Sequence, residues 1–324
     1  MNICILQPTD AADSPFKNVD VPMDPAPYLR GHTCRHVSIE HATAVEQVTA
    51  LAGQGFDVFF NLCDGASDEA RAGIEVLRTL EKLRVPFTGA ASDFYEPTRE
   101  EQVAACRARG VGVPGSVVAR SVEALEDAAR LRFPLFVKHP SSYGSLGLTR
   151  ASRVVDRAAL FEQGTRMIRE FGSARVEEFI EGREFTVLVA ENPDDGLPIA
   201  YWPGELRFPA GESFKHFDLK WKDFGDMSTV PCTEPALAER LKEASRQMFL
   251  GLNGSGYGRC DVRVNAAGEI FMLEINPNCG VFYPPYSYAS ADLILLNDPA
   301  GHEGFANTLI RSAFKRAGRA PPAV

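Results

Sequence analysis

Short apolar runs alternate with helical patterns over residues 1–95. Strands are predicted at residues 3–6 and 58–62, and a further strand is predicted to start near Val85. Over residues 68–84 the apolar side chains recur every three or four positions, which predicts an amphipathic helix. Strands that alternate with helices are typical of an α/β unit built on a parallel sheet. We therefore expect such a unit at the start of the chain.

A second domain is predicted to begin near Pro97, where a helix start follows. Thr98 fits the N-cap position and Glu101, three residues on, fits its capping-box partner. Beyond this helix, strands are predicted at residues 133–139, 175–180 and 184–190, and helices at residues 156–171 and 235–250. The proline-rich residues 10–30 are expected to form a loop over the first domain, as a candidate substrate lid.

Composition and charge exclude several classes of protein. Of the 324 residues, 45% are hydrophobic and 24% are charged, which excludes disorder and fibrous repeats. The net charge is −9 and no basic stripe offsets it, so we expect neither nucleic acid nor an anionic membrane as partner. No apolar run is long enough to span a bilayer. The seven cysteines contain no Cys-x-x-Cys pair, which favours a reducing, cytoplasmic location.

Lys138 ends a predicted apolar strand and precedes a loop of serines and glycines at residues 141–147. A lysine there can place its ammonium group beside phosphate oxygens, while glycines let backbone N–H groups approach the same oxygens. The spacing matches neither a P-loop nor a dinucleotide fingerprint. A lysine that extends along the surface before a flexible loop explains the pattern equally well.

A second candidate site lies on a predicted hairpin at residues 259–276. If residues 266–267 form a two-residue turn, Arg259 lies opposite Glu274, whereas a three-residue bulged turn would shift this register. One face then carries four polar side chains, namely Arg259, Asp261, Glu274 and Asn276. An all-oxygen set of this kind suits Mg²⁺ held jointly with substrate phosphates. A surface hairpin with an Arg259–Glu274 salt bridge is the alternative.

Three motifs follow one another along the chain: Val137-Lys138 with its Ser/Gly loop, residues 177–186 (EEFIEGREFT), and Arg259-x-Asp261 with Glu274-x-Asn276. In order and spacing they resemble the ATP-grasp superfamily, and within it D-alanine–D-alanine ligase and its relatives. The resemblance covers residues 61–280. It implies an α/β (α+β) ATP-grasp fold, with an N-terminal parallel-sheet domain (residues 1–95) and two α+β subdomains (residues 96–182 and 183–324) that clamp ATP.

The resemblance also implies roles for single residues. The residues expected to bind ATP are Lys138, Ser145, Glu177, Phe179, Ile180, Glu184, Phe214 and Lys220. Lys138 and Lys220 would meet the phosphates, with Lys222 as a competitor for Lys220. Residues 177–180 would form a hinge segment around the adenine, and Phe214 would pack on the same base. Glu184 would hold the ribose hydroxyls.

The metal and the chemistry follow from the same resemblance. Asp261, Glu274 and Asn276 would ligate two Mg²⁺ ions, with Mn²⁺ as the alternative metal and Glu274 as the bridge. Arg259, together with Lys220 and Glu274, is expected to be catalytic and would steady a developing oxyanion. When ATP activates a carboxylate, anionic oxygens come together, so metals and cationic side chains must neutralise them. Residues 141–147 and 202–226 are the candidates for closing the site against water.

The sequence also departs from the ligase pattern. The helix that starts the second domain usually brings a lysine toward the nucleotide, and spacing from Pro114 places that position at Glu101. Gly144 stands where a loop serine is expected and Trp221 where a tyrosine is common. Residues 277–286 replace a stretch rich in serine and threonine. The residues for ATP are thus retained, whereas the pocket for D-alanine is not.

Candidate substrate contacts are Asp64, Glu69, Trp221, Arg259, Gly280 and Tyr283. Asp64 and Glu69 could hold a substrate ammonium group; the equally weighted alternative is that this acidic stretch serves only to cap a helix, at Asp68. The aromatic residues 282–288 could line the pocket or only pack under a loop. A homodimer is compatible with the resemblance.

The leading hypothesis is an ATP-dependent carboxylate–amine ligase that joins two small amino-acid-like substrates through an acyl phosphate, in specialised metabolism. One alternative is a cell-wall D-alanine–D-alanine ligase with a diverged pocket. The other is a non-catalytic nucleotide-binding protein, which Glu101 favours.

Overall fold

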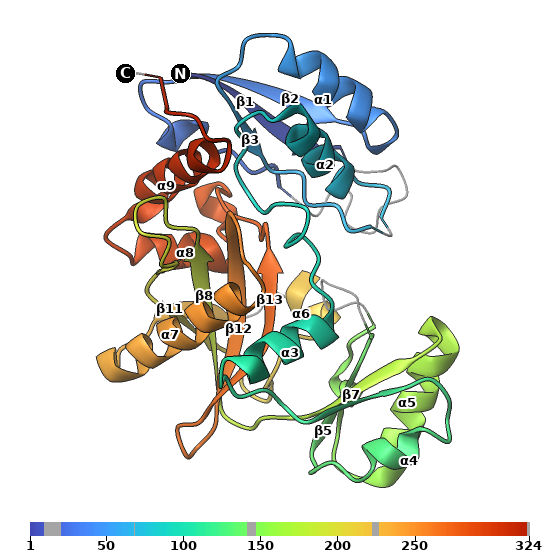
Figure 1. The fold of residues 1–324 in the computed structure, drawn as a ribbon. Coiled ribbons are helices and arrows are strands. Elements are labelled where there is room, and N and C mark those ends of the chain that lie inside the picture. The colour runs from blue at the N-terminus through green and yellow to red at the C-terminus, as the bar shows by residue number, and fades with distance from the viewer. Residues whose placement is uncertain (10–20, 68, 141–146, 222–226, 323–324) are drawn as a thin grey trace.

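The computed structural model describes residues 1–9, 21–67, 69–140, 147–221 and 227–322, and of Lys220 and Trp221 the backbone alone. The described residues form three sheets with helices packed against them (Figure 1). This arrangement confirms the predicted mixed α/β fold class. The three sheets lie within the three predicted domain ranges, and the boundaries themselves stay a prediction.

The N-terminal sheet is parallel, in the order β2–β1–β3. Its elements are β1 (Asn2–Pro8), β2 (Thr33–Ile39) and β3 (Val58–Asn61), with helices α1 (Ala44–Ala52) and α2 (Ile74–Leu83). Both strands predicted here are confirmed. The strand expected near Val85 is reduced to one bridge between Phe59 and Phe87. The ladder stops there because the Asn61 N–H donates to the Thr88 hydroxyl (3.1 Å) and not to a backbone carbonyl.

The central sheet is antiparallel, in the order β4–β7–β5–β6. Its strands are β4 (Ser116–Ala119), β5 (Leu135–Lys138), β6 (Arg153–Val154) and β7 (Ala174–Glu178), and helices α4 (Leu125–Ala128) and α5 (Arg157–Phe171) pack on it. The predicted helix at residues 156–171 is confirmed. Its N-terminus is capped by the Asp156 carboxylate, which accepts the Ala159 N–H at 2.9 Å. It ends at Gly172, whose φ of 77° is a left-handed conformation.

The C-terminal sheet has the strand order β11–β10–β8–β12–β13, and the short strand β9 pairs with the C-terminal end of β8. Its strands are β8 (Arg183–Ala190), β9 (Ile199–Ala200), β10 (Gly204–Arg207), β11 (Ser228–Pro231), β12 (Tyr257–Val264) and β13 (Ile270–Pro277). Helices α3 (Arg99–Ala108) and α7 (Pro235–Gly251) pack on one face, and α8 (Ser290–Leu296) and α9 (Gly301–Arg316) on part of the other. A short helix, α6 (Phe217–Trp221), follows β10.

The cores of the first and last sheets are continuous. Alternate residues of β1 point to its two faces, so that Cys4 and Leu6 pack into a core shared by α1, α2 and α7, and Ile3 and Ile5 into the core beneath α9. The α9 helix accordingly lies against the N-terminal sheet in Figure 1.

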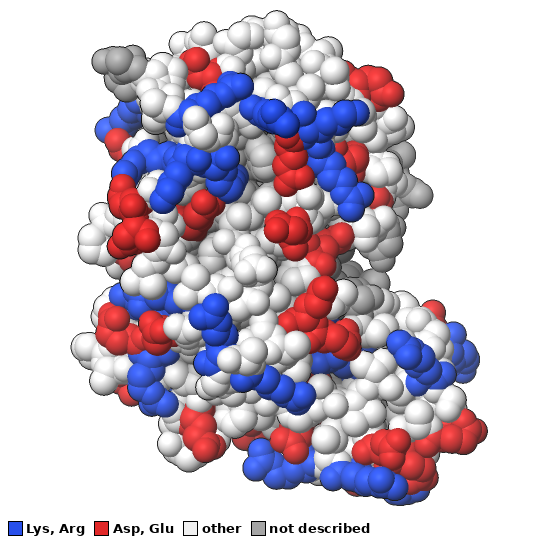
Figure 2. Space-filling model, viewed as in Figure 1, with Lys and Arg blue, Asp and Glu red and all other residues white. Residues whose placement is uncertain are grey.

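Acidic and basic side chains alternate on the face of the molecule in Figure 2. No helix in the described part of the chain is both long and apolar enough to cross a membrane.

Candidate functional site

A cavity of about 670 Å³ lies between the central and C-terminal sheets. Strands β5 and β7 line one side, strands β8, β12 and β13 line the other, and residues 64–66, 69–71, 95–99 and 277–293 close one end. A concave volume of this size suits a small-molecule ligand. The cavity contains most of the side chains that the sequence predicted to be functional.

The turn of the β12–β13 hairpin has three residues, not the two predicted. The Asn265 N–H donates to the Glu269 carbonyl (3.1 Å), and Gly268 between them has a φ of 76°, which glycine adopts readily. The longer turn moves the strand pairing by one residue. A β-bulge that leaves Leu273 unpaired then moves it by one more.

These two shifts together preserve the predicted face. Asp261 lies opposite Glu274 and Arg259 opposite Asn276, so the predicted Arg259–Glu274 pairing is wrong. A single shift would have turned Glu274 and Asn276 to the opposite face from Asp261. Because the shifts add to two, all four polar side chains still point into the cavity.

Of the three expected metal ligands, Asn276 lies within hydrogen-bond reach of both Asp261 and Glu274. The Asn276 amide donates to Asp261 and to Glu274, at 3.2 Å each, and Thr186 donates to Asp261 at 3.1 Å. Arg259 donates twice to Asp261, at 2.9 Å each. The Asp261 and Glu274 side chains are only 16% and 24% exposed, which argues against a surface hairpin.

This donor set fits magnesium. Its protein ligands would be two carboxylates and one carboxamide, all oxygen donors on adjacent strands. Mg²⁺ is usually held by one or two carboxylates, with phosphate oxygens and water completing six ligands. The residues present therefore fit a metal that is shared with a phosphate-bearing substrate.

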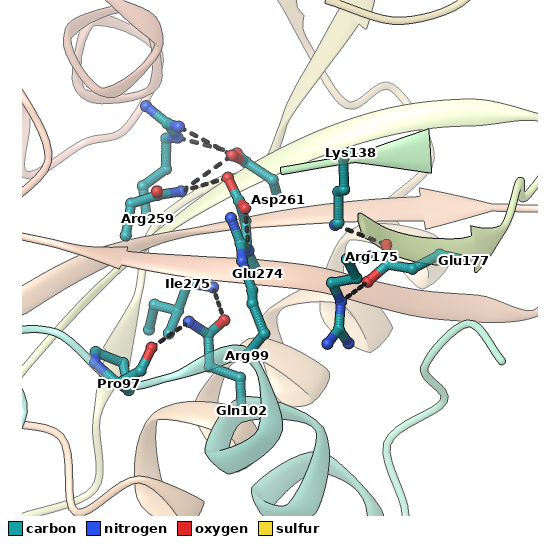
Figure 3. Close-up of polar contacts among 11 residues, drawn as sticks. Pro97, Arg99, Gln102, Lys138, Arg175, Glu177, Arg259, Asp261, Glu274 and Ile275 are labelled. Carbon is teal, nitrogen blue, oxygen red and sulfur yellow. Dashed lines mark hydrogen bonds and ion pairs between the residues drawn. The ribbon is translucent and has the colours of Figure 1, made fainter. Parts of the chain in front are cut away.

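The second predicted domain brings a cation to the cavity at Arg99, two residues before Glu101. Arg99 is the first residue of α3, lines the cavity and pairs with Glu274 (Figure 3). The Glu101 side chain instead completes the predicted capping box, since it accepts the Thr98 N–H at 2.8 Å. Burial raises the pKa of Glu274, but Arg99 and Lys138 outweigh it and lower the pKa to about 2. Glu274 is therefore ionised at neutral pH.

Lys138 lies in the cavity as part of a buried chain of charges. Its Nζ is 2.6 Å from Glu177, which also accepts a hydrogen bond from Arg175 at 2.5 Å (Figure 3). Arg175 in turn pairs with the exposed Glu100 on α3 at 2.9 Å. Burial lowers the pKa of Lys138, and Arg99 adds to this while Glu177 opposes it. A lysine that merely extends along the surface is excluded, because its side chain is only 14% exposed.

An aromatic cluster lines the other end of the cavity. The Phe136 ring lies 4.9 Å from that of Phe214 and 5.9 Å from that of Phe179. Arg263 packs over Phe179 at 4.5 Å, donates to Glu184 at 2.9 and 3.1 Å, and donates to the Ile180 carbonyl at 2.8 Å. The cavity thus brings together the four predicted hinge and ribose residues: Glu177, Phe179, Ile180 and Glu184.

Lys215 is a further cation in the cavity. Burial lowers the pKa of its ammonium group, and Arg259 adds to this while Asp261, Glu184 and Glu274 oppose it. The sequence predicted Lys220, and not Lys215, as the lysine that would meet the phosphates. The predicted phosphate lysine, Lys220, and Trp221 lie on α6, but their side chains are outside the described residues. Gly144, Ser145 and Lys222 also lie outside the described residues.

The substrate candidates Asp64, Glu69, Gly280 and Tyr283 line the closed end of the cavity. Asp64 accepts a hydrogen bond from Arg71 at 2.8 Å, and Glu69 accepts the Ala66 N–H at 3.1 Å. Glu96 also lines this end and accepts the Ser67 N–H at 3.1 Å. Neither Arg71 nor Glu96 was predicted.

The aromatic residues after β13 have different surroundings. Tyr283 and Tyr288 line the cavity, Phe282 is buried in the core with α9, and Tyr286 is 83% exposed. Only two of the four therefore belong to the site.

Comparison with known proteins identifies the family. The model of the D-ala D-ala ligase C-terminus matches residues 116–286. The uncharacterized protein y4sG of Sinorhizobium fredii is 31% identical over 68% of this chain and 65% of its own length. The D-alanine–D-alanine ligase of Laribacter hongkongensis is 28% identical over 74% of each chain.

Solved structures share the fold. The D-alanine–D-alanine ligase of Bacillus anthracis, complexed with ATP, aligns over 98% of each chain with a TM-score of 0.71 and 18% identity. The VanG D-Ala:D-Ser ligase of Enterococcus faecalis aligns over 96% of this chain and 99% of its own, with a TM-score of 0.69 and 17% identity. The matched family model spans more than half of the chain and contains both hairpin strands and Lys138. The chain therefore belongs to the D-alanine–D-alanine ligase family, a family of ATP-dependent ligases with the ATP-grasp fold that form carbon–nitrogen bonds.

Proposed function

We propose that this chain is an ATP-dependent ligase that activates the carboxylate of one amino-acid-like substrate and joins it to the amine of another. One observation carries the proposal. Two half-buried carboxylates and a carboxamide converge in the cavity and are surrounded by four cations: Arg99, Lys138, Lys215 and Arg259. Such a mixture suits a triphosphate held with divalent metal. Without the negative phosphates between them, the four cations would repel one another.

The nucleotide would occupy the side of the cavity between β7 and β12. Its base would lie in the apolar end between Phe179 and Phe214, close to the backbone at Ile180. Its ribose would approach Glu184, which Arg263 holds in place from the neighbouring strand. The phosphates would then extend toward Lys138 and Lys215. These placements are supported by contacts among the lining side chains, since the Phe179 and Phe214 rings are 6.1 Å apart and Arg263 contacts both Phe179 and Glu184.

Asp261, Glu274 and Asn276 would hold Mg²⁺, which when bound would neutralise the transferring phosphoryl group. The first substrate's carboxylate oxygen attacks the γ-phosphorus of ATP, which forms an acyl phosphate and releases ADP. The second substrate's amine then attacks the acyl carbon, and phosphate leaves. Arg259 lies beside the ligand cluster and would stabilise the negative oxygen that forms in this second step.

The acidic end of the cavity favours substrates with an ammonium group. Asp64, Glu69 and Glu96 outnumber Arg71 and Arg99 there, so the surplus charge is negative. An α-ammonium group placed there would leave its own carboxylate free to point toward the phosphates. This supports an amino acid as the substrate that is activated.

Arg99 weakens the non-catalytic alternative, because the cation that Glu101 could not supply is present two residues earlier on α3. The names of the curated relatives support the cell-wall alternative. The substitutions at the substrate end support a different amino-acid pair, and with it a role in specialised metabolism.

We predict that D-alanine alone will not support efficient ADP release. The hydroxyl expected at the substrate end is absent at Gly144, and Tyr283 brings a bulky ring into the cavity. A buried group left without its hydrogen-bond partner costs about 1–3 kcal/mol, or roughly fivefold to 150-fold in binding.

The measurement is a coupled ADP assay with ATP, Mg²⁺ and amino acids singly and in pairs, with products identified by mass. Formation of D-alanyl-D-alanine at ordinary enzyme rates, about 1–1000 per second, would replace this prediction with the cell-wall function. ADP release without any amino-acid adduct would contradict the ligase proposal itself.

We also predict that Lys215→Met will weaken MgATP binding about tenfold, since one charge-assisted contact contributes roughly 1.4 kcal/mol. Methionine keeps the length and the apolar stem of the side chain. Lys242→Met on α7, outside the cavity, is the matched control. Calorimetric titration with MgATP measures both, and equal affinities would exclude Lys215 from the nucleotide site.

A further inference from the structure

We infer that the buried pair Asp292–His302 positions the segment at residues 279–290, here called the substrate segment, and thereby determines which amino acids the cavity accepts. The inference extends the proposed function to residues outside the cavity. Asp292 lies on α8 and is fully buried, and His302 lies on α9 and is 5% exposed. Neither residue lines the cavity.

The Asp292 carboxylate fastens the substrate segment at two places. It accepts the Phe282 N–H at 2.7 Å and the Ala289 N–H at 3.0 Å. Its third contact is His302 Nε2 at 2.9 Å, which must carry the proton because a carboxylate can only accept. Between the two fastened amides, Tyr283, Ser287 and Tyr288 line the cavity.

The backbone conformation of Phe282 indicates that the surrounding structure constrains the substrate segment. This buried residue has a φ of 70°, a left-handed conformation that a bulky side chain rarely adopts. Such a conformation persists only where its surroundings over-determine it. The bond from Phe282 N–H to Asp292 is one such constraint, and the bond from Asp24 N–H to the Phe282 carbonyl (2.8 Å) is another.

The imidazole also orients a ring of the cavity wall. His302 lies between two tyrosines, with ring centroids 4.6 Å from Tyr28 and 5.8 Å from Tyr288, both in stacked geometry. Tyr288 faces the cavity, so the position of the imidazole sets the position of a residue that substrate would meet. Loss of the imidazole would thus free both the Asp292 carboxylate and the Tyr288 ring.

The test compares His302→Ala with His302→Gln, which keeps an N–H donor. Ser312→Ala is the matched control, since Ser312 is fully buried on the same helix and loses one hydrogen bond, to Glu191, outside the segment. Amide hydrogen exchange is measured on the free protein. We expect His302→Ala to speed exchange in peptides that contain Phe282 and Ala289 by about tenfold, and His302→Gln and the control to leave it unchanged. If His302→Ala does not fold, Asp292→Asn replaces it, with the same expected exchange.

The kinetic arm uses the amino-acid pair that the ADP assay identifies. We expect His302→Ala to raise the KM for the amino acids about tenfold and the KM for ATP less than twofold, with recovery in His302→Gln. Equal losses for ATP and amino acids would overturn the inference, as would unchanged exchange in the segment. If no pair releases ADP from the natural protein, the proposed function fails, while the exchange measurement still decides the positioning role.

Discussion

Replacement of Glu274 by glutamine is expected to lower turnover by at least about a thousandfold while the protein stays folded. Glutamine keeps the shape and one acceptor oxygen, but it removes the charge that would bind metal. Arg99 and Lys138 hold the pKa of Glu274 at about 2, so the wild-type carboxylate is fully ionised at the pH of any ordinary assay. The variant therefore tests the charge and not a protonation state.

Glu205→Gln is the control for this variant. Glu205 is a buried glutamate of the same sheet, paired with Arg183 at 2.7 Å, and it does not line the cavity. Steady-state ADP release and thermal unfolding are measured on both variants. Wild-type-like turnover in a folded Glu274→Gln protein would remove the metal assignment.

Loss of either phosphate cation should have the next largest effect. We expect Lys138→Ala and Arg99→Ala each to reduce kcat/KM for ATP by the equivalent of about 2–4 kcal/mol, or roughly thirtyfold to a thousandfold. Both side chains are nearly buried, at 14% and 10% exposure, so solvent screens their charges little. Arg99→Lys should recover part of the loss because it restores the charge without the planar guanidinium.

Arg311→Ala is the control for the cations, because Arg311 is 53% exposed and pairs with Asp194 at the surface. Exposed ion pairs contribute little to stability. Neither Arg311 nor Asp194 lines the cavity. A loss below about threefold for both Lys138→Ala and Arg99→Ala would exclude these residues from phosphate binding.

The sequence was sufficient for the strands and helices whose patterns are strongly periodic. The apolar stripe of α2 and the caps of α3 and α5 are local properties, and they appear where expected. The start of α2 was placed too early, because Gly65 and Gly73 pair closely and hold the chain in a bridge before the helix begins.

The hairpin shows why the metal face could be predicted and its pairing could not. Period-two alternation fixes which residues share a face within each strand. Register across strands depends on the turn and on bulges, and neither the three-residue turn nor the bulge at Leu273 has a clear sequence signal apart from Gly268. The predicted face survived because two one-residue shifts added together.

The missed residues share a physical cause. Arg99, Arg175, Lys215 and Arg263 lie one or two residues from a predicted site or capping residue, but their directions depend on how separate elements meet. Counting back from Pro114 gave Glu101, whereas the N-cap at Thr98 already marked position 99 as the first residue of the helix. For Arg99 a usable signal was therefore present in the capping box.

The most direct test of the ligase proposal follows an oxygen atom. If the first substrate's carboxylate attacks ATP, one of its oxygens leaves with phosphate when the amine displaces the acyl phosphate. The measurement uses the active amino-acid pair, with ¹⁸O in the carboxylate of the activated substrate, and mass analysis of the phosphate released. The account predicts one ¹⁸O atom per phosphate, in equal amounts with ADP and ligated product, whereas unlabelled phosphate or the release of AMP and pyrophosphate would contradict it.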